Sequence, residues 1–408
     1  MFNTIEEALL DFKNGNPILV VDNESRENEG DIIFPADAAT QEKLNLCATH
    51  AKGLVCIAID PKIAERLNLS PVASNHKDPF HTAFYDSIDA NPSFGITTGI
   101  SAKERAITAG HIANPNSSPN DFIKPGHLFP VVAKTNGVLV RQGHTEAAVD
   151  LCKLTNHQPA AIICEVMDAE GNMMRREGLF EFASKLELKV ITIQQIVDYR
   201  NQTENHLLFV AKSSLPTPFG NFDIEVYENI LTGVEQVLIS MKKTENKPIV
   251  RIHSECLTGD IFGSLKCDCQ QQLHSALSLI AENGHGYIVY LKGQEGRGIG
   301  IGNKIAAYAL QEQGLNTYEA NERLGLPKDS RNYIDAIWIF KALNINDFYL
   351  MSNNPEKINA LTKAGLTFNI LQVGVTTTSH NQQYLADKIE IGKPVSYTHL
   401  TLPTIYSV

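Results

Sequence analysis

Residues 287–302 read YIVYLKGQEGRGIGIG, and this stretch decides the fold class of the second half of the chain. Its first five residues are apolar or aromatic, as in a buried strand. A glycine-rich loop follows at once, and a helix is predicted from about Asn303 to Gln313, before Gly314. A strand, a glycine-rich loop and a helix in this order aim backbone N–H groups at an anion. The pattern is typical of an α/β domain.

The glycine-rich loop, residues 293–302, allows two interpretations. It lacks the Lys-Ser/Thr ending of a Walker A loop, and its glycines miss the dinucleotide-binding spacing. Such loops are often simple turns. Arg297 at the loop centre can hold a phosphate through two hydrogen bonds, and this favours phosphate binding.

Strand-like and helix-like stretches alternate along the rest of the chain. Thr4 and Glu7 have capping-box spacing, so a helix should open the chain. Residues 18–21 are all apolar and predict a buried strand. A further amphipathic helix should end at Asn283-Gly284.

Two domains are expected from this alternation. Residues 201–206 are polar and aperiodic and form the best candidate linker. We therefore expect an α/β (α+β) protein with two separate mixed-sheet domains, residues 1–200 and 207–394, joined by this short polar linker. The tail, residues 395–408, follows abruptly without a helical pattern, and we expect it to be foreign to the native protein.

The composition is that of an ordinary soluble globular protein. Of 408 residues, 43% are hydrophobic and 20% are charged. The net charge of −11 argues against a nucleic-acid groove but allows local basic pockets for phosphorylated small molecules. No apolar run approaches a membrane span, and the acidic start is unlike a signal peptide. Seven cysteines without an export signal argue against a disulfide framework, so we expect a cytoplasmic protein that binds neither nucleic acid nor membrane.

Three cysteines, Cys256, Cys267 and Cys269, lie within fourteen residues. A structural zinc normally has four protein ligands, whereas a catalytic zinc has three and keeps one position for water or substrate. Water activated by zinc is a nucleophile near neutral pH, so the segment indicates a hydrolytic site. Reactive or buried thiols, or a four-ligand site completed by a histidine, would give the same spacing.

Polar residues suited to a nucleotide follow the cysteines. They are Gln272, the Glu295-Gly296-Arg297 loop, Asp329, Arg331 and the run from Ser352 to Lys357. Zinc, two arginines, a lysine and a carboxylate would suit a nucleoside triphosphate attacked by activated water. Taken alone, Asp329 and Arg331 could instead be a surface ion pair, and residues 353–355 could be a turn that starts a helix.

In order and spacing, these motifs resemble GTP cyclohydrolase II from about Leu207 to Lys393. The resemblance rests on residues 253–260, 267–269, 293–300 and 329–331. It implies hydrolytic opening of the imidazole ring of GTP, with loss of formate and release of pyrophosphate. It also implies Zn²⁺ on Cys256, Cys267 and Cys269, with Mg²⁺ accompanying GTP.

The resemblance also assigns roles to single residues. Asp329 would accept a proton, and Arg331 would act in phosphate cleavage. Because a guanidinium is always charged, we expect Arg331 to stabilise the transferring phosphate and not to attack it. The GTP contacts implied by position are Arg251, Ile252, His253, Ser254, Glu255, Gln272, Glu295, Gly296, Arg297, Thr317, Ser352 and Lys357.

In the first half of the chain, a dense acidic loop follows the predicted strand at residues 18–21. Residues 22–31 read DNESRENEGD and place five carboxylates within ten positions. A charged surface loop is the default interpretation, but carboxylates crowded at a strand end can also hold divalent cations. Residues 138–140 predict a second strand that runs into Arg141, and residues 161–164 predict a third that ends in Glu165. Three such ends would gather polar groups at one sheet edge, where α/β sites usually lie.

These motifs, together with residues 97–102 and 124–130, resemble 3,4-dihydroxy-2-butanone 4-phosphate synthase from about Thr4 to Tyr199. The implied reaction converts ribulose 5-phosphate into 3,4-dihydroxy-2-butanone 4-phosphate and formate, using Mg²⁺ or Mn²⁺. The implied metal ligands are Glu27 and His144. The implied substrate contacts are Arg26, Glu27, Asp31, Arg141, Gln142, Gly143, His144, Thr145 and Glu165.

Glu165 and His127 would be the catalytic residues of this half, in proton transfer. Without the motif, His127 would be interpreted as a structural histidine. The two halves together resemble bifunctional riboflavin biosynthesis enzymes, and the resemblance implies a homodimer formed through the first domain. Glu104, Lys266 and Gln270 depart from the residues usual in the two families. Two alternatives therefore stay open: an enzyme with one active domain, and a regulatory module that binds guanine nucleotide without turnover.

Overall fold

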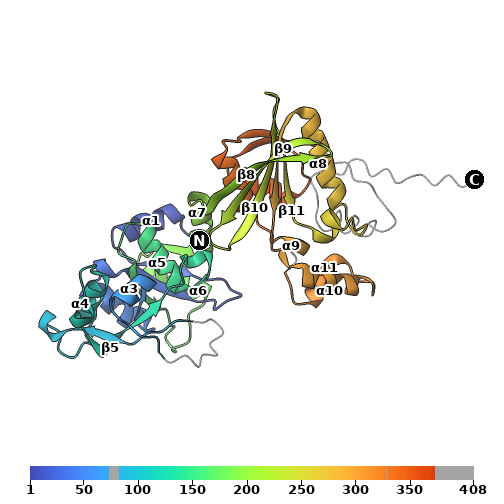
Figure 1. Ribbon diagram of the computed structural model, residues 1–408. Coiled ribbons are helices and arrows are strands. Elements are labelled where there is room, and N and C mark those ends of the chain that lie inside the picture. The colour runs from blue at the N-terminus through green and yellow to red at the C-terminus, as the bar shows by residue number, and fades with distance from the viewer. Residues whose placement is uncertain (73–81, 328, 373–408) are drawn as a thin grey trace, which may run out of the picture. The chain divides into compact units, whose positions relative to one another are not determined.

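The computed structural model describes residues 1–72, 82–327 and 329–372. They form two compact units, unit 1 (Met1–Glu204) and unit 2 (from Asn205 onward). Each unit contains one mixed seven-stranded sheet flanked by helices (Figure 1). The predicted α/β class with two mixed-sheet domains is confirmed. The predicted foreign tail, residues 395–408, lies outside the described residues.

Unit 1 alternates strands and helices in the sheet order β4-β5-β3-β6-β2-β1-β7. Its strands are β1 (Ile18–Val21), β2 (Gly30–Pro35), β3 (Cys56–Ile59), β4 (Ile88–Ala90), β5 (Phe122–Val132), β6 (Ala160–Glu165) and β7 (Val190–Thr192). Its α-helices are α1 (Ile5–Lys13), α2 (Gln41–Leu46), α3 (Pro61–Arg66), α4 (Ala102–Ala113), α5 (His144–Leu154), α6 (Arg176–Lys185) and α7 (Ile193–Thr203). Short turns of 3₁₀ or π helix are η1 (Ala36–Ala38), η2 (Cys47–Ala51), η3 (Pro92–Phe94), η4 (Pro119–Asp121) and η5 (Gly137–Leu139).

The side chains of β1 show how the sheet of unit 1 is buried on both faces. Ile18 and Val20 pack in a core formed with α1, α5 and α7, whereas Leu19 and Val21 pack in a core formed with α2, α3, α4 and α6. Successive strand residues point to opposite faces, so four apolar residues in a row serve two cores. Burial of each such side chain stabilises the fold by about 1.5–3 kcal/mol.

The strand directions define one edge at which polar groups meet. Strands β1 and β6 are both antiparallel to β2, so they run in the same direction. Their carboxyl ends lie at the edge where β2 begins, and there Val21 pairs with Gly30 and Asp31 pairs with Glu165. The acidic loop and Glu165 therefore meet as the sequence predicts.

The predicted strand at residues 138–140 is wrong. The segment forms the 3₁₀ turn η5 and then leads into α5, whose first residue is His144. Gly137 adopts φ +61°, and the N–H of Val138 donates to Asp150 Oδ2 at 2.8 Å. A carboxylate on α5 thus satisfies the backbone that a neighbouring strand would otherwise have paired.

Unit 2 has the sheet order β14-β13-β11-β12-β10-β9-β8. Its strands are β8 (Leu207–Thr217), β9 (Gly220–Asn229), β10 (Val234–Lys242), β11 (Ile249–Ser254), β12 (His285–Leu291), β13 (Asp347–Leu350) and β14 (Thr367–Ile370). Its helices are η6 (Leu257–Ile261), α8 (Cys269–Asn283), α9 (Glu295–Gly298), α10 (Ile301–Gln311), α11 (Thr317–Arg323), α12 (Ile334–Ala342) and α13 (Pro355–Lys363).

Strands β11 to β14 are parallel, so the loops after β11, β12 and β13 leave the same edge of the sheet. Helix α8 covers one face through residues such as Ile280, and α12 and α13 cover the other through residues such as Phe340 and Leu361. This edge is where α/β sheets usually bind ligands. Every cluster of polar residues predicted for GTP lies on or near these loops.

The element boundaries confirm two predictions and refine two others. The capping box at Thr4 and Glu7 forms, and Gly284 ends α8 in a left-handed conformation, as expected. The helix predicted from about Asn303 begins at Ile301. Helix α7 continues to Thr203, so half of the predicted linker is helical. Among the described residues, no helix is long and apolar enough to cross a membrane.

Candidate active sites

Asp22 organises the acidic loop of unit 1. Its buried carboxylate accepts hydrogen bonds from the N–H groups of Glu27 (3.0 Å) and Glu29 (2.9 Å) and from Arg26 Nη1 (3.0 Å). Arg26 Nη1 also lies 2.7 Å from Glu27 Oε2. These bonds hold the Glu27 carboxylate 3.7 Å from His144 Nδ1. No role was predicted for Asp22, and its position directly after the strand was the only signal for it.

Asp31 and His144 are the buried charged pair of this corner. His144 Nδ1 lies 3.7 Å from Asp31 Oδ1. Burial raises the pKa of Asp31 to about 7, and nearby Glu165 adds to the rise against the opposing effect of His144. Burial alone would lower the pKa of His144, but Asp31 and Glu27 outweigh it and raise that pKa to about 9. The corner thus concentrates negative charge around one imidazole.

Three buried polar atoms in this corner have no hydrogen-bond partner among the described residues: Asp31 Oδ1, His144 Nε2 and Glu165 Oε2. An unsatisfied buried polar atom costs about 1–3 kcal/mol, so a group of them indicates a missing ligand. Adjacent ligands of one Mg²⁺ lie about 3 Å apart, so the 3.7 Å between Glu27 Oε2 and His144 Nδ1 would have to shorten for both atoms to bind one ion. Carboxylate oxygens and an imidazole suit Mg²⁺ or Mn²⁺. The residues present therefore fit a divalent cation.

The turn from Arg141 to Thr145 completes this site. Arg141 Nη1 lies 2.5 Å from Glu146 Oε2, and its Nη2 donates to Thr82 Oγ1 at 3.3 Å. A Cβ on Gly143 would lie 2.3 Å from Arg141 Nη1 and would displace the guanidinium from this position. Thr145 is buried at the start of α5. Exposed Gln142, together with Arg26, lines a cleft of about 260 Å³.

His127 lies on β5 near the same edge. Phe129 of β5 and Ile163 of β6 pair with the same residue of β3, so they lie at the same level of the sheet. His127 and Glu165 are each two residues further toward the edge at which β6 ends. Asp89 accepts a hydrogen bond from the His127 N–H (2.8 Å) and lies 2.7 Å from His127 Nδ1. This fixes the ring and leaves Nε2 as the nitrogen that can act on a substrate.

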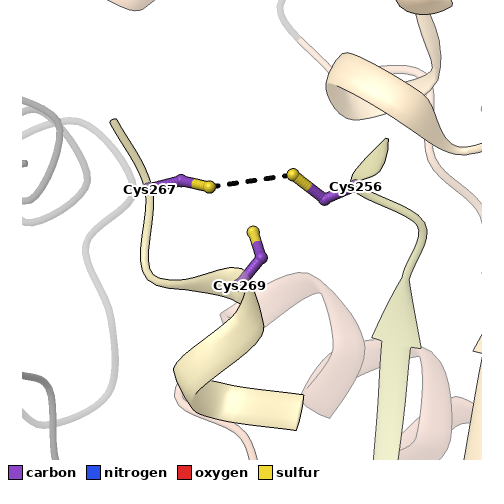
Figure 2. A group of neighbouring side chains, drawn as sticks. All are labelled: Cys256, Cys267 and Cys269. Carbon is purple, nitrogen blue, oxygen red and sulfur yellow. Dashed lines mark hydrogen bonds between the residues drawn. The ribbon is translucent and has the colours of Figure 1, made fainter. Parts of the chain in front are cut away.

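The three cysteines of unit 2 point toward one another (Figure 2). Their sulfur atoms all lie within 4.8 Å of one another, and Cys256 Sγ is 3.7 Å from Cys267 Sγ. Three thiolates on one tetrahedral Zn²⁺ would lie about 3.8 Å apart. A Cβ on Gly259 would lie 2.7 Å from Cys267 Sγ, so the loop closes tightly on the cluster. Among the described residues, the group holds three cysteines and no histidine, which fits a zinc with one open position.

Several residues predicted to contact GTP form a buried network beneath the loop that carries the cysteines. Arg251 Nε donates to His253 Nδ1 at 3.0 Å, and His253 Nε2 lies 3.0 Å from Asp260 Oδ1. Burial lowers the pKa of His253 to about 4, so the ring is neutral and donates through Nε2. Arg251 Nη2 donates to Gln272 Oε1 at 2.5 Å. Sequence motifs could not show that Arg251 and His253 are only 5% and 2% exposed.

The glycine-rich loop forms hydrogen bonds with two neighbouring segments, one next to Cys256 and one next to Asp329. Glu295 Oε2 accepts the N–H of Leu257 (2.6 Å) next to Cys256, and Ser330 N–H donates to Arg297 O (2.9 Å). Arg297 adopts φ +67°, a left-handed conformation that costs a non-glycine residue about 1–2 kcal/mol. Such strain concentrates at binding sites. The loop therefore joins the cysteine cluster to the segment that carries Asp329.

Asp329 and Arg331 form an ion pair. The sequence allowed a surface ion pair as one interpretation, but this pair is largely buried. Arg331 Nη2 lies 2.5 Å from Asp329 Oδ2, and both side chains are more than four-fifths buried. Burial raises the pKa of Asp329, but the hydrogen bonds and charge of Arg331 outweigh it, so the net pKa is lowered. Asp329 is therefore an ionised carboxylate near neutral pH.

The remaining predicted contacts occupy the same edge of unit 2. Gly293 N–H donates to Glu255 Oε2 (2.8 Å), and Lys357 Nζ donates to Ile252 O (2.8 Å). The Ile252 side chain is in the core, so only its main chain can reach a ligand. Ser254 donates to Gln294 and Ser352 is buried beside β13. Thr317 begins α11, and its side chain lies outside the described residues.

The three departures from the family patterns are accommodated. Gln270 lies in the first turn of α8 and donates to Asp260 O at 3.3 Å. Lys266 forms a surface ion pair with Glu312 at 2.8 Å. Glu104 lies in the first turn of α4, which Ser101 caps, and it accepts hydrogen bonds from the N–H and hydroxyl of Thr97. Each of the three side chains therefore has a hydrogen-bonding partner in this fold.

The comparisons with known proteins agree with this arrangement. Residues 6–199 match the family model of 3,4-dihydroxy-2-butanone 4-phosphate synthase, and residues 209–370 match that of GTP cyclohydrolase II. The riboflavin biosynthesis protein RibBA of Aquifex aeolicus (strain VF5) is 47% identical over 390 residues, covering 95% of this chain and 96% of that protein. The chain belongs to the RibBA family.

Other RibBA relatives and a solved structure are similar over nearly the whole chain. RibBA of Bacillus subtilis (strain 168) is 46% identical over 393 residues, covering 95% of this chain and 98% of that protein. The crystal structure of RibBX, a two-domain 3,4-dihydroxy-2-butanone 4-phosphate synthase from A. baumannii, matches with a TM-score of 0.65 and 28% identity, covering 92% of this chain and all of that one. As a RibBA protein, the chain is a bifunctional enzyme of riboflavin biosynthesis, a synthase (lyase) joined to a cyclohydrolase (hydrolase).

No role was predicted from the sequence for two polar residues that lie close to the cysteines. Asp260 lies in the motif of residues 253–260 but received no role, and Lys304 received none either. Lys304 stands on α10 between Ile301 and Ala307 and is only 8% exposed. A single charge on an otherwise apolar helix face was the signal that could have found it.

Proposed function

We propose that the acidic corner of unit 1 binds ribulose 5-phosphate and releases 3,4-dihydroxy-2-butanone 4-phosphate and formate. Glu27 and His144 would hold Mg²⁺ or Mn²⁺, which would supply positive charge to stabilise an enediolate. Arg26, Asp31 and the turn from Arg141 to Thr145 would hold the sugar phosphate. The buried atoms Asp31 Oδ1, His144 Nε2 and Glu165 Oε2, which lack a hydrogen-bond partner in the part of the chain that the structure describes, support this assignment.

Proton transfer in unit 1 is assigned to Glu165 and His127. Both lie at the edge where the proposed metal ligands gather, and an imidazole and a carboxylate are side chains that general acid–base catalysis commonly uses. Asp89 holds the His127 ring through Nδ1, so Nε2 would carry the proton. Glu165 Oε2 is buried, which favours a proton exchanged with bound substrate over one exchanged with bulk water.

We propose that unit 2 hydrolyses GTP to 2,5-diamino-6-(5-phosphoribosylamino)pyrimidin-4(3H)-one, formate and pyrophosphate. Cys256, Cys267 and Cys269 would hold Zn²⁺, which would supply a Lewis acid that activates water for attack on C8 of the base. Asp329 would accept the proton. Arg331, held by two hydrogen bonds to Asp329, would stabilise charge on the transferring phosphate, with Mg²⁺ accompanying GTP.

The observation that carries the second assignment is the spacing of the sulfur atoms. The 3.7 Å between Cys256 and Cys267 is within about 0.1 Å of the spacing that tetrahedral zinc requires. Of the alternatives, the silent nucleotide-binding module would need no such site. The homodimer and the cytoplasmic location stay predictions, which sedimentation of the purified protein and cell fractionation would test.

Formate release from each substrate tests the two assignments separately. Cys267→Ser should abolish formate and pyrophosphate release from GTP and remove zinc, while ribulose 5-phosphate turnover continues. Glu27→Gln should abolish formate release from ribulose 5-phosphate while GTP turnover continues. The control Glu24→Gln changes an exposed residue of the same loop and should leave both activities intact. Loss of both activities in either variant, with the protein folded, would contradict the two independent sites.

A further inference from the structure

Lys304 is a buried cation that the proposed chemistry does not use. Its ammonium lies 3.1 Å from Cys256 Sγ, 2.8 Å from Thr258 Oγ1 and 2.5 Å from Glu295 Oε1. An ammonium has three N–H donors, so each donor has one acceptor. All three acceptors belong to the cysteine loop or the glycine-rich loop.

Burying an ammonium is costly unless opposite charge compensates it. Glu295 Oε1, at 2.5 Å, and Cys256 Sγ, at 3.1 Å, are both close enough to the Lys304 ammonium to compensate its charge. The lysine is therefore stable at this position only because sulfur and carboxylate are both there.

The pair formed by Lys304 and Glu295 also holds the backbone around Cys256. Glu295 Oε2 accepts the N–H of Leu257, and Glu295 Oε1 accepts from Lys304. Lys304 then reaches back to Cys256 Sγ and to the hydroxyl of Thr258. Residues 256, 257 and 258 are thus each bound by one member of the pair.

We propose that Lys304 is a positioning residue for the zinc site, which holds Cys256 Sγ toward the other two sulfurs and compensates the excess negative charge of three thiolates. The proposal rests on the zinc site assigned above. Three thiolates and Zn²⁺ carry a net charge of −1 in a largely buried pocket, and a cation at hydrogen-bond distance offsets it. Hydrogen bonds from outer groups to metal ligands tune affinity in this way.

A simpler role for Lys304 would be to neutralise Glu295 alone. In that case removal of both charges together would restore the site, because no unpaired carboxylate would remain. If Lys304 acts on the sulfur, the double variant would stay impaired. The double variant Glu295→Gln/Lys304→Met therefore separates the two roles.

The experiment uses the full chain and measures metal binding, not turnover. Zinc affinity is measured by competition with a chromogenic chelator, and the sulfur-to-cobalt charge-transfer band is recorded after Co²⁺ substitution. Lys304→Met should weaken zinc binding by about 10–100-fold. The band should move to longer wavelength, because a sulfur without the cation gives up an electron more easily.

Three further variants complete the test. Lys304→Arg keeps the charge and should keep the band near its wild-type position, and Lys363→Met, at an exposed lysine of α13, should change nothing. The fluorescence of Trp338 confirms that unit 2 is folded in each variant. Wild-type affinity and band in Lys304→Met, or their recovery in the double variant, would overturn the role of Lys304. Absence of tight zinc binding in the wild type would instead overturn the zinc site itself.

Discussion

Replacement of Asp260 by Asn should loosen unit 2 around its cysteine loop. The Asp260 carboxylate is almost fully buried and accepts hydrogen bonds from Cys256 N–H (3.0 Å), Tyr290 OH (2.9 Å) and His253 Nε2 (3.0 Å). Arg251 donates to the other ring nitrogen of His253, so the ring cannot turn its proton away from Asp260. The side-chain amide of the Asp260→Asn variant would therefore point its own N–H group at the Nε2–H group of His253, and neither donor would have an acceptor there.

The structure gives the size of this effect. One buried donor would be left without an acceptor, at about 1–3 kcal/mol, and two bonds to a charged acceptor would become weaker neutral ones, at about 1 kcal/mol each. The free energy of unfolding of unit 2 should fall by about 3–5 kcal/mol, the range found when a buried polar pair is broken. Tyr290→Phe removes one donor and leaves the rest, so it should cost about 1–2 kcal/mol.

Urea unfolding followed by tryptophan fluorescence measures this directly, because Trp338 is the single tryptophan and packs in unit 2. The matched control is Asp347→Asn, where the carboxylate is 62% exposed and pairs with Lys247. A surface pair contributes at most about 1 kcal/mol. Zinc content is measured on the same samples. If Asp260→Asn lowers the stability of unit 2 no more than Asp347→Asn does, the buried network does not hold the loop.

Three further variants probe other contacts. Gly259→Ala would place a Cβ 2.7 Å from a cysteine sulfur, so zinc affinity in a chelator competition should fall at least about tenfold. Glu146→Gln removes the partner of Arg141 and should lower kcat/KM for ribulose 5-phosphate about tenfold or more, while GTP turnover stays unchanged. Hydrogen bonds from Thr97 and Ser101 lower the pKa of Glu104 to about 2. Glu104→Gln should therefore destabilise unit 1 in denaturant above the ordinary pKa of 4.5, and the difference from wild type should shrink as the pH falls toward 2.

Local patterns predicted those parts of the fold that local physics decides. The capping box of Thr4, the buried strand at residues 18–21 and the glycine that ends α8 each depend on neighbours within a few positions. The strand predicted at residues 138–140 failed because its pattern is three residues long and its real partner is Asp150, twelve residues away. A short apolar run does not show what its backbone will bond to.

The site was predicted in its ligand types but not in its supporting contacts. The cysteine spacing indicated zinc without help from the fold, since a chemical preference is carried by residue type. Whether Arg251 faces GTP or the interior depends on Gln272 and on Met351 O, which are distant in the sequence. A polar residue that contacts the ligand and a polar residue that only supports such a contact can belong to the same sequence motif. The spacing of the motif therefore does not distinguish the two roles.

The two sites differ in how their charge is balanced, and this difference follows from the metals that they fit. The corner of unit 1 gathers carboxylates around His144, has Arg26 beside Glu27, and still holds three buried atoms without a hydrogen-bond partner among the described residues, which favours the binding of a further cation. The cysteine cluster of unit 2 has the ammonium of Lys304 beside Cys256. Thiolates on Zn²⁺ would leave an excess of negative charge that the chain itself must offset, whereas the carboxylates of unit 1 can be offset by the ion that they bind.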